Sequence, residues 1–181
     1  MTRAAVLAPG YGGGATQPIL RSLAKALAGY GIESLPIEFA TRGKRPSRDY
    51  ERELADLRAA RDELRATHHL VALVGRSFGG RMCALLAAVE PPDALAIVSH
   101  PIAPPDRPRP RDEAALAGMQ CRTLVVQGAK DELGPVAVLE RIAGQNPRID
   151  LVIIADAGHD LGAREREAID HVARWLDASL R

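Results

Sequence analysis

A serine flanked by glycines is the residue of this sequence best suited to chemistry. The pentapeptide Gly75-Arg76-Ser77-Phe78-Gly79 follows the apolar run 70–74 and precedes a stretch of helical character at 81–89. This pattern between a buried strand and a helix is typical of a nucleophile elbow, a sharp turn that exposes a strained serine at the end of a sheet. Glycine at both flanks lets neighbouring backbone approach closely. Ser77 is therefore predicted to be a nucleophile; the alternative is a serine that only caps a helix.

Two further residues that the chemistry requires follow buried-strand runs later in the chain. Asp131 comes after the run 124–128, and His159 comes after the run 151–154. The carboxyl ends of parallel strands meet at one edge of a sheet, where ligands bind. We expect His159 to act as the general base for Ser77 and Asp131 to orient its imidazole. Asp156 is a reserve for the acid, and Glu132 is a weaker one.

A glycine-rich loop at residues 9–14 is the expected source of an oxyanion donor. Acyl transfer needs two backbone N–H groups where negative charge develops, and one should come from Phe78, the residue after the nucleophile. We assign the second to Tyr11, with Gly12 as the alternative, and expect Gly10 and Gly12 to contact the substrate. A phosphate-binding loop is disfavoured, because the glycine spacing departs from G-x-G-x-x-G and no Walker-type lysine follows.

Three more side chains are candidates for a role at the substrate. Arg76 and Arg81, which flank the elbow, could attract an anionic substrate, although a solvated or ion-paired arginine is the commoner case. His100 ends a strand at the expected catalytic edge and could line the pocket. The other histidines fit less well: His68 and His69 precede the elbow strand, and His171 lies in the last expected helix.

Composition narrows the class of protein. The chain has 181 residues, 46% of them apolar, and is expected to form a single domain over 1–181. With 24 basic and 23 acidic residues, 3% aromatics and one short basic cluster at 42–48, nucleic-acid binding is disfavoured. No run is long enough for a membrane span or a signal-peptide core.

The two cysteines indicate where in the cell the protein is expected. Cys83 and Cys121 are the only cysteines, and both are expected to be buried thiols, which favours a cytoplasmic protein. No metal and no cofactor is expected, and the oligomeric state is left open.

The apolar periodicity predicts alternating strands and helices. Strands are expected at 4–8, 34–39, 70–74, 94–99, 124–128 and 151–154. Helices are expected at 16–30, from 46 or 47 to 67, and at 81–89, 113–118, 135–144 and 164–179. This alternation predicts an α/β fold of about six mostly parallel strands with helices on both faces.

Several segments together resemble a small lidless branch of the α/β-hydrolases. This branch is similar to dienelactone hydrolase and related to the NSL-complex subunit three and testis-expressed protein thirty. The matching segments are Gly75 to Arg81, Ser99 to Pro105, Val126 to Gly134, and Gly158-His159. The resemblance implies a minimal α/β-hydrolase fold without a cap domain, and a Ser77, Asp131 and His159 triad.

Two residues depart from the family pattern. Many relatives begin the oxyanion loop with His-Gly, where this chain has Pro9-Gly10. True dienelactone hydrolases carry a cysteine nucleophile, whereas this chain has Ser77, which disfavours that substrate.

The leading hypothesis is a serine hydrolase that cleaves a small carboxylic ester or thioester through an acyl-enzyme. An open site without a cap favours short acyl chains. The alternative is a hydrolase-like module that binds a ligand or partner without turnover, although a binding module needs neither a nucleophile nor its base. Perhydrolysis or amide cleavage by the same residues is a third possibility.

Overall fold

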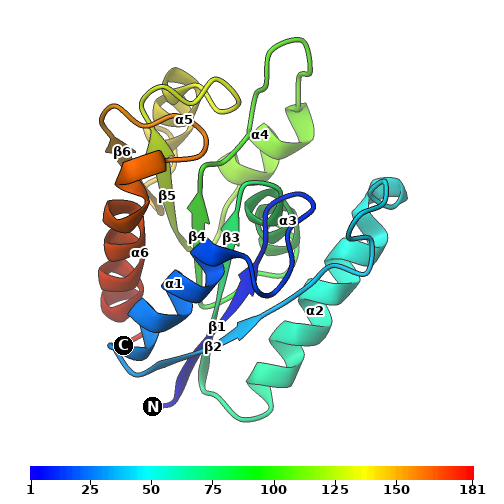
Figure 1. Cartoon of the computed structure of the whole chain (residues 1–181), viewed down its shortest axis with the longest axis vertical. Helices are drawn as coiled ribbons and strands as arrows, with labels where there is room; N and C mark the ends of the chain where they lie inside the picture. Colours follow the sequence, from blue (N-terminus) through cyan, green and yellow to red (C-terminus); the bar gives the residue numbers. More distant parts are fainter.

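The fold is built on one sheet in which every neighbouring pair of strands is parallel (Figure 1). The computed structural model describes residues 1–181. The strands are β1 (Arg3–Ala8), β2 (Ile32–Pro36), β3 (Leu70–Arg76), β4 (Ala94–Val98), β5 (Arg122–Gly128) and β6 (Ile149–Ile154), in the order β2-β1-β3-β4-β5-β6. The predicted α/β architecture of six strands is confirmed, and no domain is inserted over the sheet.

Six α-helices cover the two faces of the sheet. They are α1 (Pro18–Ala28), α2 (Glu51–Arg65), α3 (Phe78–Ala87), α4 (Pro110–Ala117), α5 (Val136–Ala143) and α6 (Glu165–Ser179). One core cluster packs α1 and α6 against the sheet, and the other packs α2, α3, α4 and α5 against the opposite face. Figure 1 shows α1 and α6 side by side, away from α2 and α3. None of the helices combines the length and apolar character that a membrane crossing requires.

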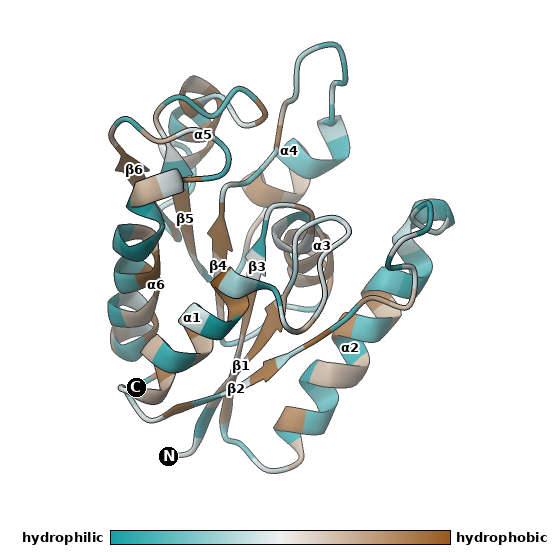
Figure 2. Cartoon of the chain, viewed as in Figure 1, coloured by the Kyte–Doolittle hydropathy of each residue, from teal (hydrophilic) through white to brown (hydrophobic).

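The strands are apolar because both of their faces are covered. In β1, Ala5 and Leu7 belong to the core under α1 and α6, while Ala4, Val6 and Ala8 belong to the other core. All five side chains are fully buried. Figure 2 shows the central strands as hydrophobic, whereas α2 and α6 carry hydrophilic residues on their outer sides. Strands buried on both faces are typical of parallel sheets.

Several predicted boundaries were wrong, among them that of the third helix, which was expected at 81–89 and spans Phe78–Ala87. Three others have a local reason. The second strand was expected at 34–39 but spans Ile32–Pro36, because Ile32 pairs with Arg3 and Pro36 pairs with Leu7. The helix expected from 46 or 47 begins at Glu51, because Asp49 and Tyr50 adopt left-handed φ values of 52° and 62°.

The fourth helix begins at Pro110 rather than at 113. Proline is tolerated in the first turn of a helix, where its missing N–H has no intrahelical acceptor to lose.

Close backbone contact joins the start of α3 to the end of β1. A Cβ atom at Gly79 would lie 2.4 Å from the carbonyl oxygen of Ala8 and 2.5 Å from that of Pro9. A Cβ atom at Gly75 would lie 2.4 Å from the backbone nitrogen of Gly80. Backbone atoms on both sides cannot move aside as a flexible side chain could. The two glycines of the elbow are therefore required by packing, as the sequence predicts.

Replacing Gly79 with alanine is expected to destabilise the protein, because the new methyl group overlaps two backbone carbonyls. The expected loss is about 1–3 kcal/mol or more in the free energy of unfolding, measured by urea denaturation. Gly158→Ala is the control, since the nearest atom to its added Cβ is 3.9 Å away. Equal stability of the two variants would contradict this account of the packing.

Candidate active site

Ser77 lies at the turn between β3 and α3 in a backbone conformation that side chains rarely adopt. Its φ is 50° and its ψ is −113°. Two backbone hydrogen bonds hold it there: the N–H of Ser77 donates to the carbonyl of Val98 at 2.9 Å, and the N–H of Arg81 donates to the carbonyl of Ser77 at 3.0 Å. Such strain persists only where the surroundings over-determine it. The serine side chain is thereby held, partly exposed, at the end of the sheet.

The structure brings the three predicted side chains of the triad together. The Oγ of Ser77 is 2.8 Å from Nε2 of His159, and Nδ1 of His159 is 2.9 Å from Oδ2 of Asp131. An ionised carboxylate can only accept, so the imidazole proton belongs on Nδ1. Nε2 is then free to accept the hydroxyl proton of Ser77. The three groups form one chain of hydrogen bonds from a buried carboxylate to a partly exposed hydroxyl.

His159 reaches Ser77 because its loop folds back over the end of β5. The histidine follows β6, which is separated from β3 by β4 and β5. In the returning loop, the carbonyl of Ala157 accepts a hydrogen bond from the N–H of Lys130 at 2.8 Å. A Cβ atom at Gly128 would lie 2.5 Å from the carbonyl oxygen of Ala157. The glycine at the end of β5 is therefore what lets the histidine loop pass.

Arg76 holds the same loop from the other side. Its Nη2 donates to the carbonyl of His159 at 2.9 Å, and its Nη1 is 3.3 Å from Nε2 of that imidazole. Asp160 lies 3.4 Å from the guanidinium, and burial lowers the pKa of Arg76 despite that carboxylate. The arginine does not line the cleft beside Ser77. The contact with substrate predicted for Arg76 is thus replaced by a contact with the candidate base.

Gln127 is a buried polar residue that the sequence analysis missed. Its Nε2 donates to Oδ2 of Asp131 at 2.8 Å and to the carbonyl of Gly134 at 2.9 Å. Its Oε1 accepts the N–H of His100 at 2.8 Å. The other oxygen of Asp131 accepts the N–H of Leu133 at 2.9 Å, so the carboxylate is hydrogen-bonded on both oxygens. A glutamine directly after the apolar run 124–126, four residues before Asp131, is the signal that could have identified it.

The two candidate oxyanion donors have free backbone N–H groups. Neither Tyr11 nor Phe78 donates its N–H within the chain, since Phe78 begins α3. The elbow contacts the end of β1, which leads directly into the Tyr11 loop. Gly10 donates its N–H to Oε1 of Gln17 at 2.9 Å, which ties down the loop. Gly12 adopts a left-handed φ of 71°.

His100 does not reach the cleft. Its side chain has no exposed surface, and neither ring nitrogen has a hydrogen-bond partner. Burial lowers its pKa to about 4, so the ring is neutral at pH 7. A ring without accessible surface cannot contact a substrate in this conformation. Asp156, the alternative to Asp131 as the acid, does not contact His159. It is exposed and pairs with Lys130 at 2.9 Å.

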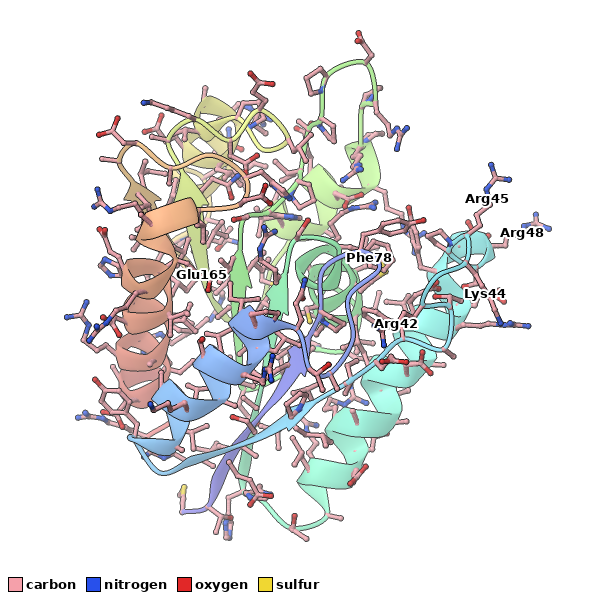
Figure 3. The ribbon with its side chains drawn as sticks, viewed as in Figure 1. Arg42, Lys44, Arg45, Arg48, Phe78 and Glu165 are labelled. Carbon is pink, nitrogen blue, oxygen red and sulfur yellow. The ribbon has the colours of Figure 1, made fainter.

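A cleft of about 780 Å³ opens beside Ser77. Its apolar side is formed by aromatic rings that meet edge to face, with Phe78 at 5.8 Å from Tyr11 and 6.2 Å from Tyr50 between ring centroids. Phe39, which is buried and does not line the cleft, packs against Phe78 at 5.6 Å. Figure 3 shows Phe78 facing the connection from β2 to α2, which carries Arg42, Lys44, Arg45 and Arg48. No group of three histidine, cysteine or acidic residues is placed to hold a metal ion.

A family model described as an alpha/beta hydrolase domain matches residues 1–180. No curated protein sequence matches the chain.

Solved structures share the fold over nearly the whole chain. An alpha-beta serine hydrolase homologue from Coxiella burnetii is 22% identical, with a TM-score of 0.81, and 97% of this chain and 86% of that chain are covered. Dienelactone hydrolase from Anabaena variabilis is 24% identical, with a TM-score of 0.80 and coverage of 99% and 88%. A monoacylglycerol lipase from Paleococcus ferrophilus is 14% identical, with a TM-score of 0.82 and coverage of 97% and 94%. At these identities the likeness shows the fold alone.

Replacing Gln127 with leucine is expected to slow the reaction of Ser77 with a fluorophosphonate. Without its amide, Asp131 loses a hydrogen bond and orients His159 less well. A hydrogen bond to a charged group contributes about 1.5–3 kcal/mol, so the labelling rate should fall about 10- to 100-fold.

Gln120→Leu is the matched control, because Gln120 is exposed and bonds only to its own turn. Circular dichroism and urea denaturation of both variants would show that the labelled protein is folded. A labelling rate of Gln127→Leu equal to that of the control would show that the amide does not support the acid.

Proposed function

Because the chain belongs to the alpha/beta hydrolase family, we propose that it is a serine hydrolase that cleaves a small carboxylic ester or thioester. The single observation that carries the proposal is the chain of hydrogen bonds from Asp131 through His159 to Ser77, with links of 2.9 Å and 2.8 Å. These are the distances at which a base can take the proton of a nucleophile. A module that only binds a ligand needs no such arrangement.

The first half of the reaction forms the acyl-enzyme. Nε2 of His159 takes the hydroxyl proton as Oγ of Ser77 attacks the carbonyl carbon, and Asp131 stabilises the resulting imidazolium. The carbonyl π pair moves to oxygen, where the N–H groups of Tyr11 and Phe78 donate to the oxyanion. When the tetrahedral intermediate collapses, the bond to the leaving group breaks. His159 then gives its proton to the departing alcohol or thiol.

The second half hydrolyses the acyl-enzyme by the same groups. His159 takes a proton from water, whose oxygen attacks the acyl carbon. Collapse of the second intermediate returns the proton to Oγ of Ser77 and releases the carboxylic acid. The complete reaction consumes only water besides the ester or thioester, so the proposal includes no cofactor and no metal.

Names of structural neighbours agree with ester chemistry without establishing it for this chain. They include a dienelactone hydrolase, a monoacylglycerol lipase and a structure described under two metagenome-derived lipolytic enzymes. The aromatic side of the cleft, where Phe78 packs against Tyr11 and Tyr50, offers an apolar surface for a short acyl group. The serine at position 77 still disfavours the dienelactone reaction itself.

We also propose that residues 1–181 form a single domain and that the protein is cytoplasmic. We further propose that it is related to the NSL-complex subunit three and testis-expressed protein thirty. The location is supported by Cys83 and Cys121, both of which are buried free thiols. Burial raises the pKa of both thiols, which makes them poor nucleophiles.

Replacing Ser77 with alanine is expected to abolish hydrolysis of 4-nitrophenyl acetate and labelling by a fluorophosphonate. Removal of a nucleophile of this kind lowers kcat by a factor on the order of 10⁶ where the triad acts as a unit. Ser22→Ala is the control, since Ser22 is exposed on α1. Hydrolysis by the Ser77 variant at the level of the control would overturn the proposal, and absence of labelling in the unmodified protein would favour the binding module.

A further inference from the structure

The cleft beside Ser77 is lined by cations and by no carboxylate. Five of its lining residues are basic and none is acidic: Lys44, Arg45, Arg81, Arg107 and Arg109. The chain as a whole carries 24 basic and 23 acidic residues, so composition does not explain this excess. The cations surround one cleft because two loops line it. Lys44 and Arg45 belong to the connection from β2 to α2, and Arg107 and Arg109 belong to the connection from β4 to α4 (Figure 1).

Arg81 differs from the other four because its charge is neutralised within the protein. It pairs with Asp112 at 2.5 Å, and both side chains are buried. Its Nη2 also lies 3.2 Å from the hydroxyl of Tyr50. Burial alone would lower the pKa of Arg81, but the charge of Asp112 and the hydrogen bonds that Arg81 donates to Asp112 and Tyr50 raise it above its usual value. This arginine serves as part of the wall.

The remaining four cations have no carboxylate partner. No ion pair includes Lys44, Arg45, Arg107 or Arg109, although most of the other basic side chains around the molecule pair with an acid. Arg109 is half-buried and donates to the carbonyl of Pro101. Burial, followed by the neighbouring guanidinium of Arg81, lowers the pKa of Arg109, although the charge of Asp112 acts in the opposite direction. An anion in the cleft would relieve this repulsion.

From this arrangement we infer that the substrate of the proposed hydrolase carries a phosphate on its leaving group. The inference rests on the proposed function and concerns the same site. Four unpaired cations exceed what one carboxylate would neutralise, and arginine forks match the oxygens of phosphate. The leaving group is the part assigned because the cations of Lys44, Arg45 and Arg107 are exposed at the rim, where a hydrated phosphate is bound and released without full desolvation.

The apolar part of the cleft suits the acyl group. Leu133 and Pro101 line the cleft together with Ser77 and Phe78, and the aromatic cluster adjoins them. A cleft of about 780 Å³ has room for much more than a short acyl chain. The large, charged end of the substrate therefore lies toward the two basic loops.

Three thioesters of pantetheine that differ in the place and kind of their negative charge test the inference. S-acetyl-pantetheine is neutral, S-acetyl-4′-phosphopantetheine adds one phosphate, and S-succinyl-pantetheine places one carboxylate on the acyl side. We expect kcat/KM to be about 10- to 100-fold higher for the phosphorylated thioester than for the neutral one, the range for charge-assisted contacts. The preference should shrink as salt screens the charges. A preference for S-succinyl-pantetheine as large as that for the phosphorylated thioester would overturn the assignment of phosphate.

The variant Lys44→Gln, Arg45→Gln, Arg107→Gln removes three cations whose side chains make no hydrogen bond or ion pair in the fold. It is expected to bring the ratio between the phosphorylated and neutral thioesters close to one. Arg48→Gln is the matched control: Arg48 belongs to the same connection, pairs with Asp49 at 3.6 Å and does not line the cleft. The control should keep the ratio of the unmodified protein.

Binding to the Ser77→Ala variant separates the inference from the proposed function. Calorimetry with 4′-phosphopantetheine and with pantetheine measures recognition of the phosphate without turnover. Equal affinities, together with Ser77-dependent hydrolysis of S-acetyl-pantetheine, would overturn the phosphate site and leave the hydrolase standing. Tighter binding of the phosphorylated compound without hydrolysis of any thioester or of 4-nitrophenyl acetate would support the site and overturn the hydrolase.

Discussion

Contact between backbone and backbone at the carboxyl end of the sheet is the constraint on which the site depends. Ser77 follows β3 and His159 follows β6, two strands that are not neighbours. Their side chains meet only because the elbow packs against the end of β1 and the histidine loop packs against the end of β5. Gly79 and Gly128 stand at these two crossings, where a Cβ atom would lie 2.4 Å and 2.5 Å from carbonyl oxygens. The contact between Ser77 and His159 thus depends on two positions that have no side chain.

Polar groups behind the site are held by a second kind of constraint, the cost of burying charge. A carboxylate taken out of water is tolerated when its oxygens are hydrogen-bonded. Asp131 meets this requirement through Gln127, Leu133 and His159, and the same contacts aim it at the imidazole. The pair of Arg81 and Asp112 meets it on the wall of the cleft. Lys44, Arg45 and Arg107 at the rim of the cleft are exposed to water, so they need no hydrogen-bond partner within the protein.

Much of the architecture is predictable from the sequence because its causes are local. Apolar runs of strand length identify the six strands, and G-x-S-x-G between a strand and a helix identifies Ser77. Asp131 and His159 follow from their positions after strands. The failures are equally local in origin: the left-handed residues Asp49 and Tyr50 delay the start of α2, and nothing in their residue types announces that conformation.

Residue types and their order along the chain were sufficient for the kind of fold and for the edge of the sheet at which Ser77, Asp131 and His159 meet. Only the folded chain decided the direction in which Arg76 and His100 point and the support of Asp131 by Gln127. It also decided that two basic loops more than fifty residues apart line one cleft. The physical reason is that strand and helix patterns arise from neighbours in sequence. Hydrogen-bond partners and cleft walls come from loops whose positions depend on the packing of everything between them.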